Sequence, residues 1–364
     1  MTDNVLEITD PVVDTQPKPG IAGAIFGNMI RDERDLPFIR LAFLLSVLFI
    51  PLAAYLFIPG NFNWWLVGVY WLLYGWFLGP YILMLHNTSH RVLFKKKYDF
   101  LNHYIPWVIG PFVGMSPETY YVHHMAMHHV DGNLPDDLSS TMKYQRDSFI
   151  DFLKYYFTFI FGTVGFVMYL VKRKRTKMVT RFLMGEGTFL VITAALLYWN
   201  FWPALMLFAI PLVFTRLMLM AGNWGQHAFV DPEEPKNDYR TVISFVNSPY
   251  NHRCFNDGYH LGHHLKASRH WLDMPADFLD KREKMIENRT LVFDKLDYFM
   301  IFVLLMLKRY KTLTKYIVQL DPENPLSEDE LLELFHRRLR KFDPATLREL
   351  STFTPPVASS GAPA

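Results

Sequence analysis

The chain of 364 residues carries a formal net charge of +2, and 51% of its residues are hydrophobic, with aromatic residues making up 16%. The near-neutral charge gives no general argument for nucleic acid as a partner. A single cysteine, Cys254, excludes an intrachain disulfide framework and an in-chain rubredoxin or ferredoxin centre, which needs four thiolates.

The first segment, residues 1–37, begins acidic and is interrupted by Pro11. A secretory signal peptide needs a basic start followed at once by an apolar run. We therefore expect no cleavable signal, and we predict that residues 1–37 form a cytoplasmic N-terminal segment.

Four apolar stretches approach the roughly 20 residues that a helix needs to cross a bilayer. The first two, at about 41–59 and 64–85, are joined by a short uncharged turn, so they predict a helical hairpin. Two more, at about 188–202 and 203–222, predict a second hairpin. The predicted fold is therefore an all-α integral membrane protein with four transmembrane helices in two hairpins.

Charge gives these hairpins an orientation. Residues 87–182 contain thirteen Lys or Arg and seven Asp or Glu, so the positive-inside rule places them in the cytoplasm. Four spans return the chain to the same side, where we expect a helical cap and both termini. We predict one membrane domain at residues 38–350, followed by a disordered tail at 351–364, which is rich in Pro, Ala and Ser.

Residues 149–171 are also long and apolar enough to cross a membrane. Asp151 and Lys154 near the start of this segment favour a helix that lies at the interface instead. Two shorter apolar segments, 104–115 and 298–307, are expected to lie in the membrane surface.

Most of the fourteen histidines stand in three short boxes, HNTSH, HHMAMHH and HLGHH. Helical residues three or four apart share a face, so each box should present converging imidazoles. The box residues that fit this spacing are His86 and His90; His124, His128 and His129; and His260, His263 and His264. Convergent imidazoles predict metal binding.

The number of histidines indicates two metal ions. A catalytic zinc typically uses about three protein ligands, so eight box histidines are too many for one ion. Imidazole suits iron, copper, zinc or nickel, and ligand type alone does not choose among them. His123 lies outside the spacing pattern, and we expect it to support a ligand and not to be one.

Other histidines and motifs are less informative. His103, His270 and His336 stand alone and are expected to be surface or packed residues. Glu333 and His336 form one Glu-x-x-His, whereas di-iron carboxylate bundles need two such units. The HExxH motif of zinc peptidases is absent, so a peptidase would lack its general base.

The three boxes, placed after a span, within a large basic segment and after the last hairpin, resemble those of the membrane fatty acid desaturase superfamily. This superfamily includes alkane hydroxylases and alkene-forming fatty acid decarboxylases. The resemblance extends from the first hairpin to about His270. It implies two iron ions, O2 as co-substrate, and a fatty acid or fatty acyl substrate within membrane lipid.

The resemblance also implies further ligands. In acyl-CoA desaturases a ninth histidine follows an asparagine by four positions, and GNWGQH supplies this pair here. It implies His227 as an iron ligand and Asn223 as a ligand through water. No His-Pro-Gly-Gly haem motif occurs, so a separate electron donor of the ferredoxin, rubredoxin or cytochrome b5 type is implied.

The reaction itself stays open at this point. The second box has three residues between His124 and the following pair, a spacing shared with alkane hydroxylases but not with acyl-CoA desaturases. Desaturation is the first choice, with hydroxylation, or oxidative decarboxylation of a free fatty acid to a terminal alkene, as alternatives. Two other classes also remain, a zinc-dependent membrane hydrolase and a non-enzymatic metal-binding membrane protein.

Several charged residues are candidates for supporting roles. Metal-bound histidines usually donate their second N–H to an acceptor. Among the acids near the boxes we favour Asp257 for this role and expect Asp131, Asp136 and Asp137 to be solvated loop acids.

Charges elsewhere bear on the membrane. Arg216 lies inside the fourth span, where a charge needs a partner, and Glu186 is predicted to pair with it. The basic run at 172–177 is expected to determine the orientation of the chain in the membrane and to contact anionic lipid. The more specific alternative is that an acidic electron carrier docks there.

Overall fold

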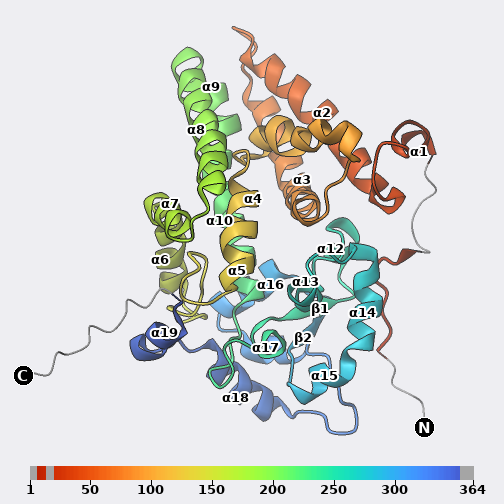
Figure 1. Ribbon diagram of the computed structural model, residues 1–364, viewed down its shortest axis with the longest axis vertical. Coiled ribbons are helices and arrows are strands. Elements are labelled where there is room, and N and C mark those ends of the chain that lie inside the picture. The colour runs from red at the N-terminus through yellow and green to blue at the C-terminus, as the bar shows by residue number, and fades with distance from the viewer. Residues whose placement is uncertain (1–5, 14–19, 353–364) are drawn as a thin grey trace, which may run out of the picture.

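The computed structural model describes residues 6–13 and 20–352. Four helical stretches in this part of the chain are long and apolar enough to cross a membrane, namely Glu33–Phe57, Trp64–His90, Thr176–Trp199 and Phe201–Gln226. The first contains a short 3-10 turn, η2 (Glu33–Asp35), and α2 (Leu36–Phe57); the second is α3 (Trp64–His90). These long helices extend from one side of the region that holds α11 to α18 (Figure 1).

Helix α3 begins where its sequence supplies a cap. The side chain of Asn63 accepts hydrogen bonds from the backbone N–H groups of Trp65 and Leu66, which satisfies two donors of the first turn. The helix then continues to His90, five residues beyond the predicted end of the second span. This extension carries the first histidine box on the last turn of the same rigid helix.

The third span was predicted to start at residue 188, but α8 (Thr176–Trp199) begins twelve residues earlier. The apolar pattern is broken there by Arg181 and Glu186, which hid the start of the helix. The fourth span consists of α9 (Phe201–Ala204), a π-helical turn η7 (Leu205–Ala209) and α10 (Ile210–Gln226).

Residues 149–171 were predicted to form one helix. They form two, α6 (Phe149–Ile160) and α7 (Thr163–Lys172), which are bent by 64° relative to each other. If α8 and α10 both cross the bilayer, a crossing here would put His128 and His227 on opposite sides of it. Their rings lie 5.3 Å apart, so a crossing by this segment does not fit with crossings by both α8 and α10.

Short helical segments connect α3 to α6. In chain order they are η3 (Lys96–His103), η4 (Ile105–Ile109), η5 (Gly110–Val113), α4 (Thr119–His123), η6 (His124–His128) and α5 (His129–Asp131). The connection packs on α10, where Thr215 Oγ1 donates a 2.7 Å hydrogen bond to the Val113 carbonyl. Gly114 has φ +70° and lies against Pro211, a position that favours glycine.

The region after α10 is mostly helical but includes a small sheet. Strand β1 (Ser244–Val246) pairs in parallel with β2 (Val292–Asp294), so the predicted helical fold is confirmed except for this one small sheet. Strands of three residues are too short to show a period-2 pattern. The helices here are α11 (Asp238–Thr241), α12 (Pro249–Arg253), α13 (His260–Leu265), η8 (Trp271–Asp273), α14 (Met274–Asp280), α15 (Arg282–Glu287), α16 (Tyr298–Met306), α17 (Tyr310–Thr314), α18 (Glu328–Leu339) and α19 (Pro344–Leu350).

The first described residues contact this region, and the last ones contact the loop between α5 and α6. Asp10 accepts hydrogen bonds from the Tyr259 hydroxyl at 2.6 Å and from the Asn247 backbone N–H at 2.8 Å. A short helix, α1 (Gly20–Phe26), precedes η2. The predicted disordered tail lies mostly outside the described residues, but Ser351 Oγ donates a hydrogen bond to Asp136.

The close packing of α8 on the loop before α4 gives a stability prediction. A Cβ at Gly185 would overlap the carbonyl oxygen of Pro117, whereas a Cβ at Gly187 on the same helix would meet nothing within 4 Å. We expect Gly185→Ala to destabilise the protein by about 1–3 kcal/mol or more, the usual cost of overpacking. Thermal unfolding in detergent should show a lower midpoint for Gly185→Ala than for the wild type, and an unchanged midpoint for the control Gly187→Ala. Equal midpoints for the two variants would contradict this packing.

Candidate metal centre

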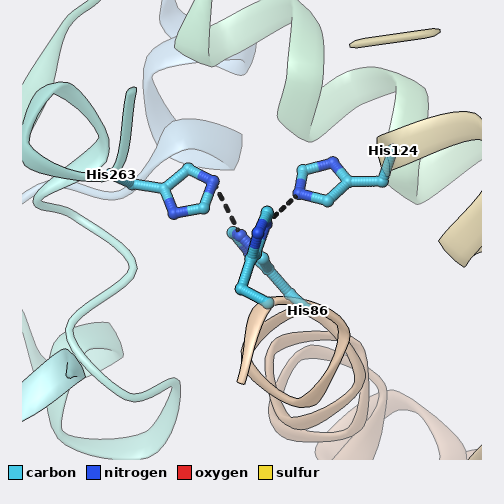
Figure 2. Close-up of side chains that lie close together, drawn as sticks. His86, His124 and His263 are labelled. Carbon is cyan, nitrogen blue, oxygen red and sulfur yellow. Dashed lines mark hydrogen bonds between the residues drawn. The ribbon is translucent and has the colours of Figure 1, made fainter. Parts of the chain in front are cut away.

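The first histidine box lies on the last turn of α3. His86 and His90 are four residues apart and therefore project from the same face. His86 Nε2 lies 3.0 Å from His263 Nε2, and His90 Nε2 lies 2.8 Å from His124 Nε2. Figure 2 shows His263 and His124 approaching the end of this helix from two sides.

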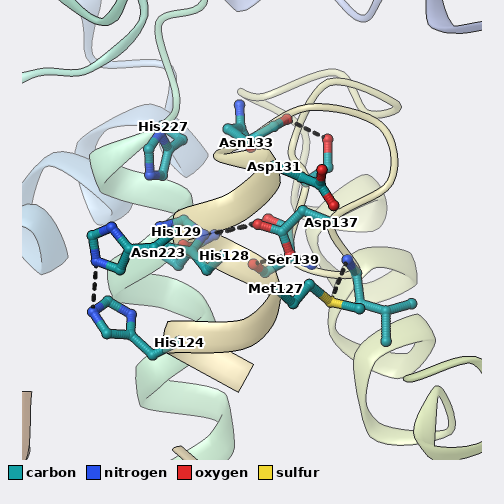
Figure 3. A network of polar contacts seen from close by, with 12 residues as sticks. His124, Met127, His128, His129, Asp131, Asn133, Asp137, Ser139, Asn223 and His227 are labelled. Atoms are coloured by element: carbon teal, nitrogen blue, oxygen red, sulfur yellow. Dashed lines mark hydrogen bonds and ion pairs between the residues drawn. The ribbon is translucent and has the colours of Figure 1, made fainter. Parts of the chain in front are cut away.

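The second box lies on a helix that changes its pitch. The π-helical turn η6 stands between α4 and α5, so the backbone has more residues per turn through the box. As a result His124 and His129 meet, with their Nε2 atoms 3.0 Å apart, while His128 is directed elsewhere (Figure 3). The expectation that His124 and His128 face one site is therefore wrong.

The third box lies on α13, and the ninth histidine stands just after α10. His260 and His264 have Nε2 atoms 3.2 Å apart, and His227 Nε2 lies 3.4 Å from that of His260. His263 projects to the other side, where its Nε2 lies 2.9 Å from His129 Nε2. This box therefore contributes to two neighbouring groups of imidazoles.

The nine histidines thus form two clusters. In each cluster four ligand atoms lie within 4.8 Å of one another: cluster A is His86, His90, His124 and His263, and cluster B is His128, His227, His260 and His264. His129 joins cluster A through its contacts with His124 and His263. Every predicted histidine ligand lies in one of the two clusters.

The spacing of the nitrogens fits metal coordination. Two nitrogens that bind one ion at about 2.1 Å and at right angles are about 3 Å apart, and the Nε2 separations here are 2.8–3.4 Å. A neutral imidazole has one N–H, so His124 Nε2, which faces both His90 and His129, is poorly satisfied by hydrogen bonds alone. The donor set therefore fits two ions.

Burial keeps these imidazoles in the form that binds metal. Burial first, and the neighbouring imidazoles second, lower the pKa of His124, His227, His260 and His263 well below the usual value. Neutral histidine is the ligand form, so protons compete with the metal only in acid.

The lowered pKa values predict a pH dependence of stability without metal. Groups whose pKa is lower in the folded state stabilise the fold fully above the unfolded pKa of about 6.5, and this contribution is lost as the pH falls below it. Each histidine contributes up to about 1.4 kcal/mol per pH unit. Protein stripped by a chelator should therefore melt at a clearly lower temperature at about pH 5.5 than at about pH 7.5; an unchanged midpoint would contradict neutral, buried imidazoles.

Asp137 holds a histidine of cluster B in place, a role that the sequence did not indicate. His128 Nδ1 donates to Asp137 Oδ2 at 2.8 Å, and the backbone N–H and hydroxyl of Ser139 donate to Oδ1 at 2.7 Å (Figure 3). Burial would raise the pKa of Asp137, but the neighbouring imidazoles of His123 and His128 hold it well below its usual range. The expectation of a solvated acid is wrong, because Asp137 is only 1% exposed. His123 Nε2 lies 3.7 Å from the same carboxylate.

The other acids near the boxes have different roles. Asp131 is buried too, and it accepts hydrogen bonds from Tyr169 and Arg173. Asp257 was favoured as the acceptor for a box histidine, yet among the described residues its carboxylate makes no hydrogen bond to one. It lines the cavity described below, and burial, with the nearby Asp297, raises its pKa to about 7.

Asn223 stands one helical turn before His227. Its Nδ2 donates to the Ser139 carbonyl at 2.9 Å and to the Tyr155 hydroxyl at 2.8 Å. These two bonds use the amide nitrogen, so the amide oxygen remains as an acceptor. Asn223 also lines the cavity next to cluster B.

A cavity of about 350 Å³ reaches both clusters. Five histidines belong to its wall: His123 and the cluster members His86, His124, His128 and His260. Most of the remaining wall is apolar and comes from α3 and α10, including Leu78, Ile82 and Leu219. Arg216 also lines it, and its Nη2 pairs with Glu186 Oε1 at 2.5 Å, which confirms the predicted ion pair.

The lone histidines lie outside both clusters. His103 is exposed, while His270 is buried and lies 3.0 Å from Asp35. Asp32, Asp35 and His270 form a third group with metal-like spacing. Arg91 bonds Asp32 at 2.9 Å and lies 3.5 Å from Asp35, so this group already has its counter-charge.

The family model described as fatty acid desaturase matches residues 63–294, a range that includes all three boxes, both clusters and all of the cavity wall except Asp297, Tyr298 and Phe299. No curated protein matches the chain, and no solved structure does.

Proposed function

The chain belongs to the fatty acid desaturase family, a family of oxidoreductases, and from this premise we propose that it oxidises a fatty acyl chain with O2 at two iron ions. Cluster A would hold one ion and cluster B the other, with Asn223 acting on the second through water. The observation that carries the proposal is that two imidazole clusters adjoin one apolar cavity.

The cavity suits an acyl chain as its guest. Ligand pockets commonly measure about 300–1,000 Å³, are mostly apolar and fix orientation with a few polar groups. Here the apolar wall can align the chain while four histidines of the two clusters line the same cavity. Bound iron would supply the O2 chemistry, and the protein would position the carbon chain and exclude water.

Desaturation is the reaction that we propose first. Hydroxylation, or decarboxylation of a free acid to a terminal alkene, would use the same clusters and cavity. A hydrolase with zinc, or a protein that only stores metal, has less support, because neither needs nine imidazoles beside a cavity shaped for an apolar chain.

Electrons would come from a separate donor of the ferredoxin, rubredoxin or cytochrome b5 type, because the one cysteine, Cys254, is buried and cannot form a redox centre alone. We propose that the donor docks from the cytoplasm. The basic residues 172–177 at the end of α7 and the start of α8 offer one surface for an acidic carrier, since Lys174 and Lys177 are exposed. The positive-inside rule supports a cytoplasmic position for the termini and both clusters.

Product analysis tests the function. Purified protein loaded with iron and supplied with reduced donor and isotopically labelled fatty substrates should consume O2 and give a product two hydrogens lighter if it is a desaturase. A product with one added oxygen would indicate a hydroxylase, and a terminal alkene would indicate a decarboxylase. Zinc binding with no O2 uptake would contradict the proposal.

Gly75 on α3 gives a prediction about chain length. It lines the cavity, and a Cβ there would meet nothing within 4 Å. Gly75→Leu should fill part of this space, so kcat/KM for long chains should fall by about tenfold relative to short chains, as expected for about 1.4 kcal/mol of lost contact. Gly68→Leu is a matched control, because Gly68 lies two turns earlier on α3 and outside the cavity wall. An unchanged preference in Gly75→Leu would remove this part of the cavity from the substrate path.

A further inference from the structure

One polar cluster interrupts the apolar wall of the cavity. Arg216 Nη2 donates to Glu186 Oε1 at 2.5 Å and to Ser116 Oγ at 3.4 Å. The hydroxyls of Ser116 and Thr119 donate to Glu186 Oε2 at 2.5 and 2.8 Å. The carboxylate of Glu186 is therefore well satisfied by the protein.

The guanidinium of Arg216, in contrast, keeps hydrogen-bond donors that the described residues do not satisfy. It has five N–H donors, and its hydrogen bonds to the described residues come from Nη2 alone. Arg216, Ser116 and Thr119 line the main cavity, and Arg216 and Thr119 also line a smaller cavity of about 40 Å³, which is the only one of the two that Glu186 lines. Donors on Nε and Nη1 thus remain for an acceptor in the main cavity.

Packing alone does not account for this cluster. A charged pair inside a membrane-spanning helix is expensive, and apolar residues of similar size would join α8 to α10 at least as well. The methyl end of an acyl chain offers no acceptor to a guanidinium, so it would be the wrong end to place here. The polar end of the substrate offers acceptor atoms to the remaining N–H donors of Arg216.

We propose that Arg216, with Ser116 and Thr119, binds the carboxyl group of an unesterified fatty acid, so that the substrate lies with its head inside the cavity. This proposal rests on the proposed function and names its substrate class. The Arg216–Glu186 pair is neutral overall. The remaining N–H groups of Arg216 can therefore donate to the carbonyl oxygen of a protonated carboxyl group, and no second charge is buried. A coenzyme A thioester is not the expected substrate, because it has no free carboxyl group to bind this cluster.

The geometry of α10 makes the proposal specific. Arg216 and Asn223 are seven residues apart, which is two turns or about 10 Å along the same helix face. A head group held at Arg216 therefore fixes the distance from the carboxyl carbon to the clusters. The position of attack should be counted from the carboxyl end and should not change with chain length.

The first test uses the wild-type holoenzyme with a reduced donor. Saturated free acids of several lengths, their methyl esters, their coenzyme A thioesters and the matching n-alkanes are compared for O2 uptake and product position. We expect the free acids to be the best substrates and to be attacked at one position counted from the carboxyl carbon. Attack at a position counted from the methyl end, or preference for the thioester, would overturn the proposal.

The second test removes the cluster without leaving a lone charge. In the double variant Arg216→Met with Glu186→Leu, KM for the free acid should rise about tenfold to a hundredfold, the range for losing a charge-assisted hydrogen bond. Product positions should also scatter, and the ratio of kcat/KM for the free acid to kcat/KM for the n-alkane should fall about tenfold or more. Lys154→Met, which breaks an ion pair with Asp151 outside the cavity, should leave the ratio of acid to alkane unchanged.

The possible outcomes separate this proposal from the function on which it rests. Oxidation of thioesters or alkanes but not of free acids would overturn the substrate class and leave the oxidase standing. O2 uptake with none of the four substrates would overturn both. An unchanged acid-to-alkane ratio in a folded double variant would remove Arg216 from substrate binding, and if that variant fails to fold, the wild-type series still decides.

Discussion

His260→Ala should reduce the iron content from two ions per chain to about one and bring turnover to background. His260 lies in the middle of cluster B, 3.4 Å from His227 and 3.2 Å from His264 at Nε2, so its loss opens the cluster directly beside the cavity. Protein side chains do not carry out O2 chemistry by themselves, so an incomplete metal pair leaves nothing to replace it. Iron analysis and O2 uptake measure the two effects together.

His263→Ala provides the matching experiment for cluster A. His263 is on the same helix, α13, but its Nε2 contacts His86 and His129. Its loss should remove the other ion and give the same inactive result. His103→Ala is the control, because His103 is exposed and lies outside both clusters. Full activity in His260→Ala, or equal iron loss in His103→Ala, would contradict the assignment.

Asp137→Asn should weaken metal binding in cluster B and leave cluster A nearly unchanged. Asp137 receives the Nδ1 hydrogen of His128 at 2.8 Å, and such partners typically change metal affinity by about 10-fold to 100-fold. The asparagine keeps the size of the side chain but removes its charge. Competition with a chelator should therefore show one ion released about 10-fold to 100-fold more easily.

The neighbouring acid gives a matched control for this prediction. Asp136 lies on the same loop but accepts hydrogen bonds from Ser351 and Thr352 near the end of the described chain. Asp136→Asn should leave the affinity for both ions unchanged. Equal weakening by the two variants would mean that the loop, and not the bond to His128, determines binding.

The sequence predicted the long helices and the histidines of the centre because both leave strong local patterns. Runs of about 20 apolar residues identify spans, and three boxes with helical spacing identify convergent imidazoles. Where charged residues enter a span the pattern fails, as it did for the first turns of α8, which contain Arg181 and stand before Glu186.

The division of the histidines between two clusters could not be predicted in the same way. The π-helical turn at His124–His128 changes which residues share a face, and its sequence gives no separate signal. Asp137 likewise resembled a loop acid, since its burial results from contacts with distant segments and not from its neighbours. The parallel pair β1 and β2 joins two strands of only three residues each, in which paired residues are 48 positions apart in the sequence.

X-ray diffraction at the iron absorption edge, from crystals of iron-loaded protein, tests the central claim most directly. We predict two anomalous peaks, one among the Nε2 atoms of His86, His90, His124, His129 and His263 and one among those of His128, His227, His260 and His264. A single peak, a peak only at Asp32, Asp35 and His270, or a signal at the zinc edge in place of iron would contradict it.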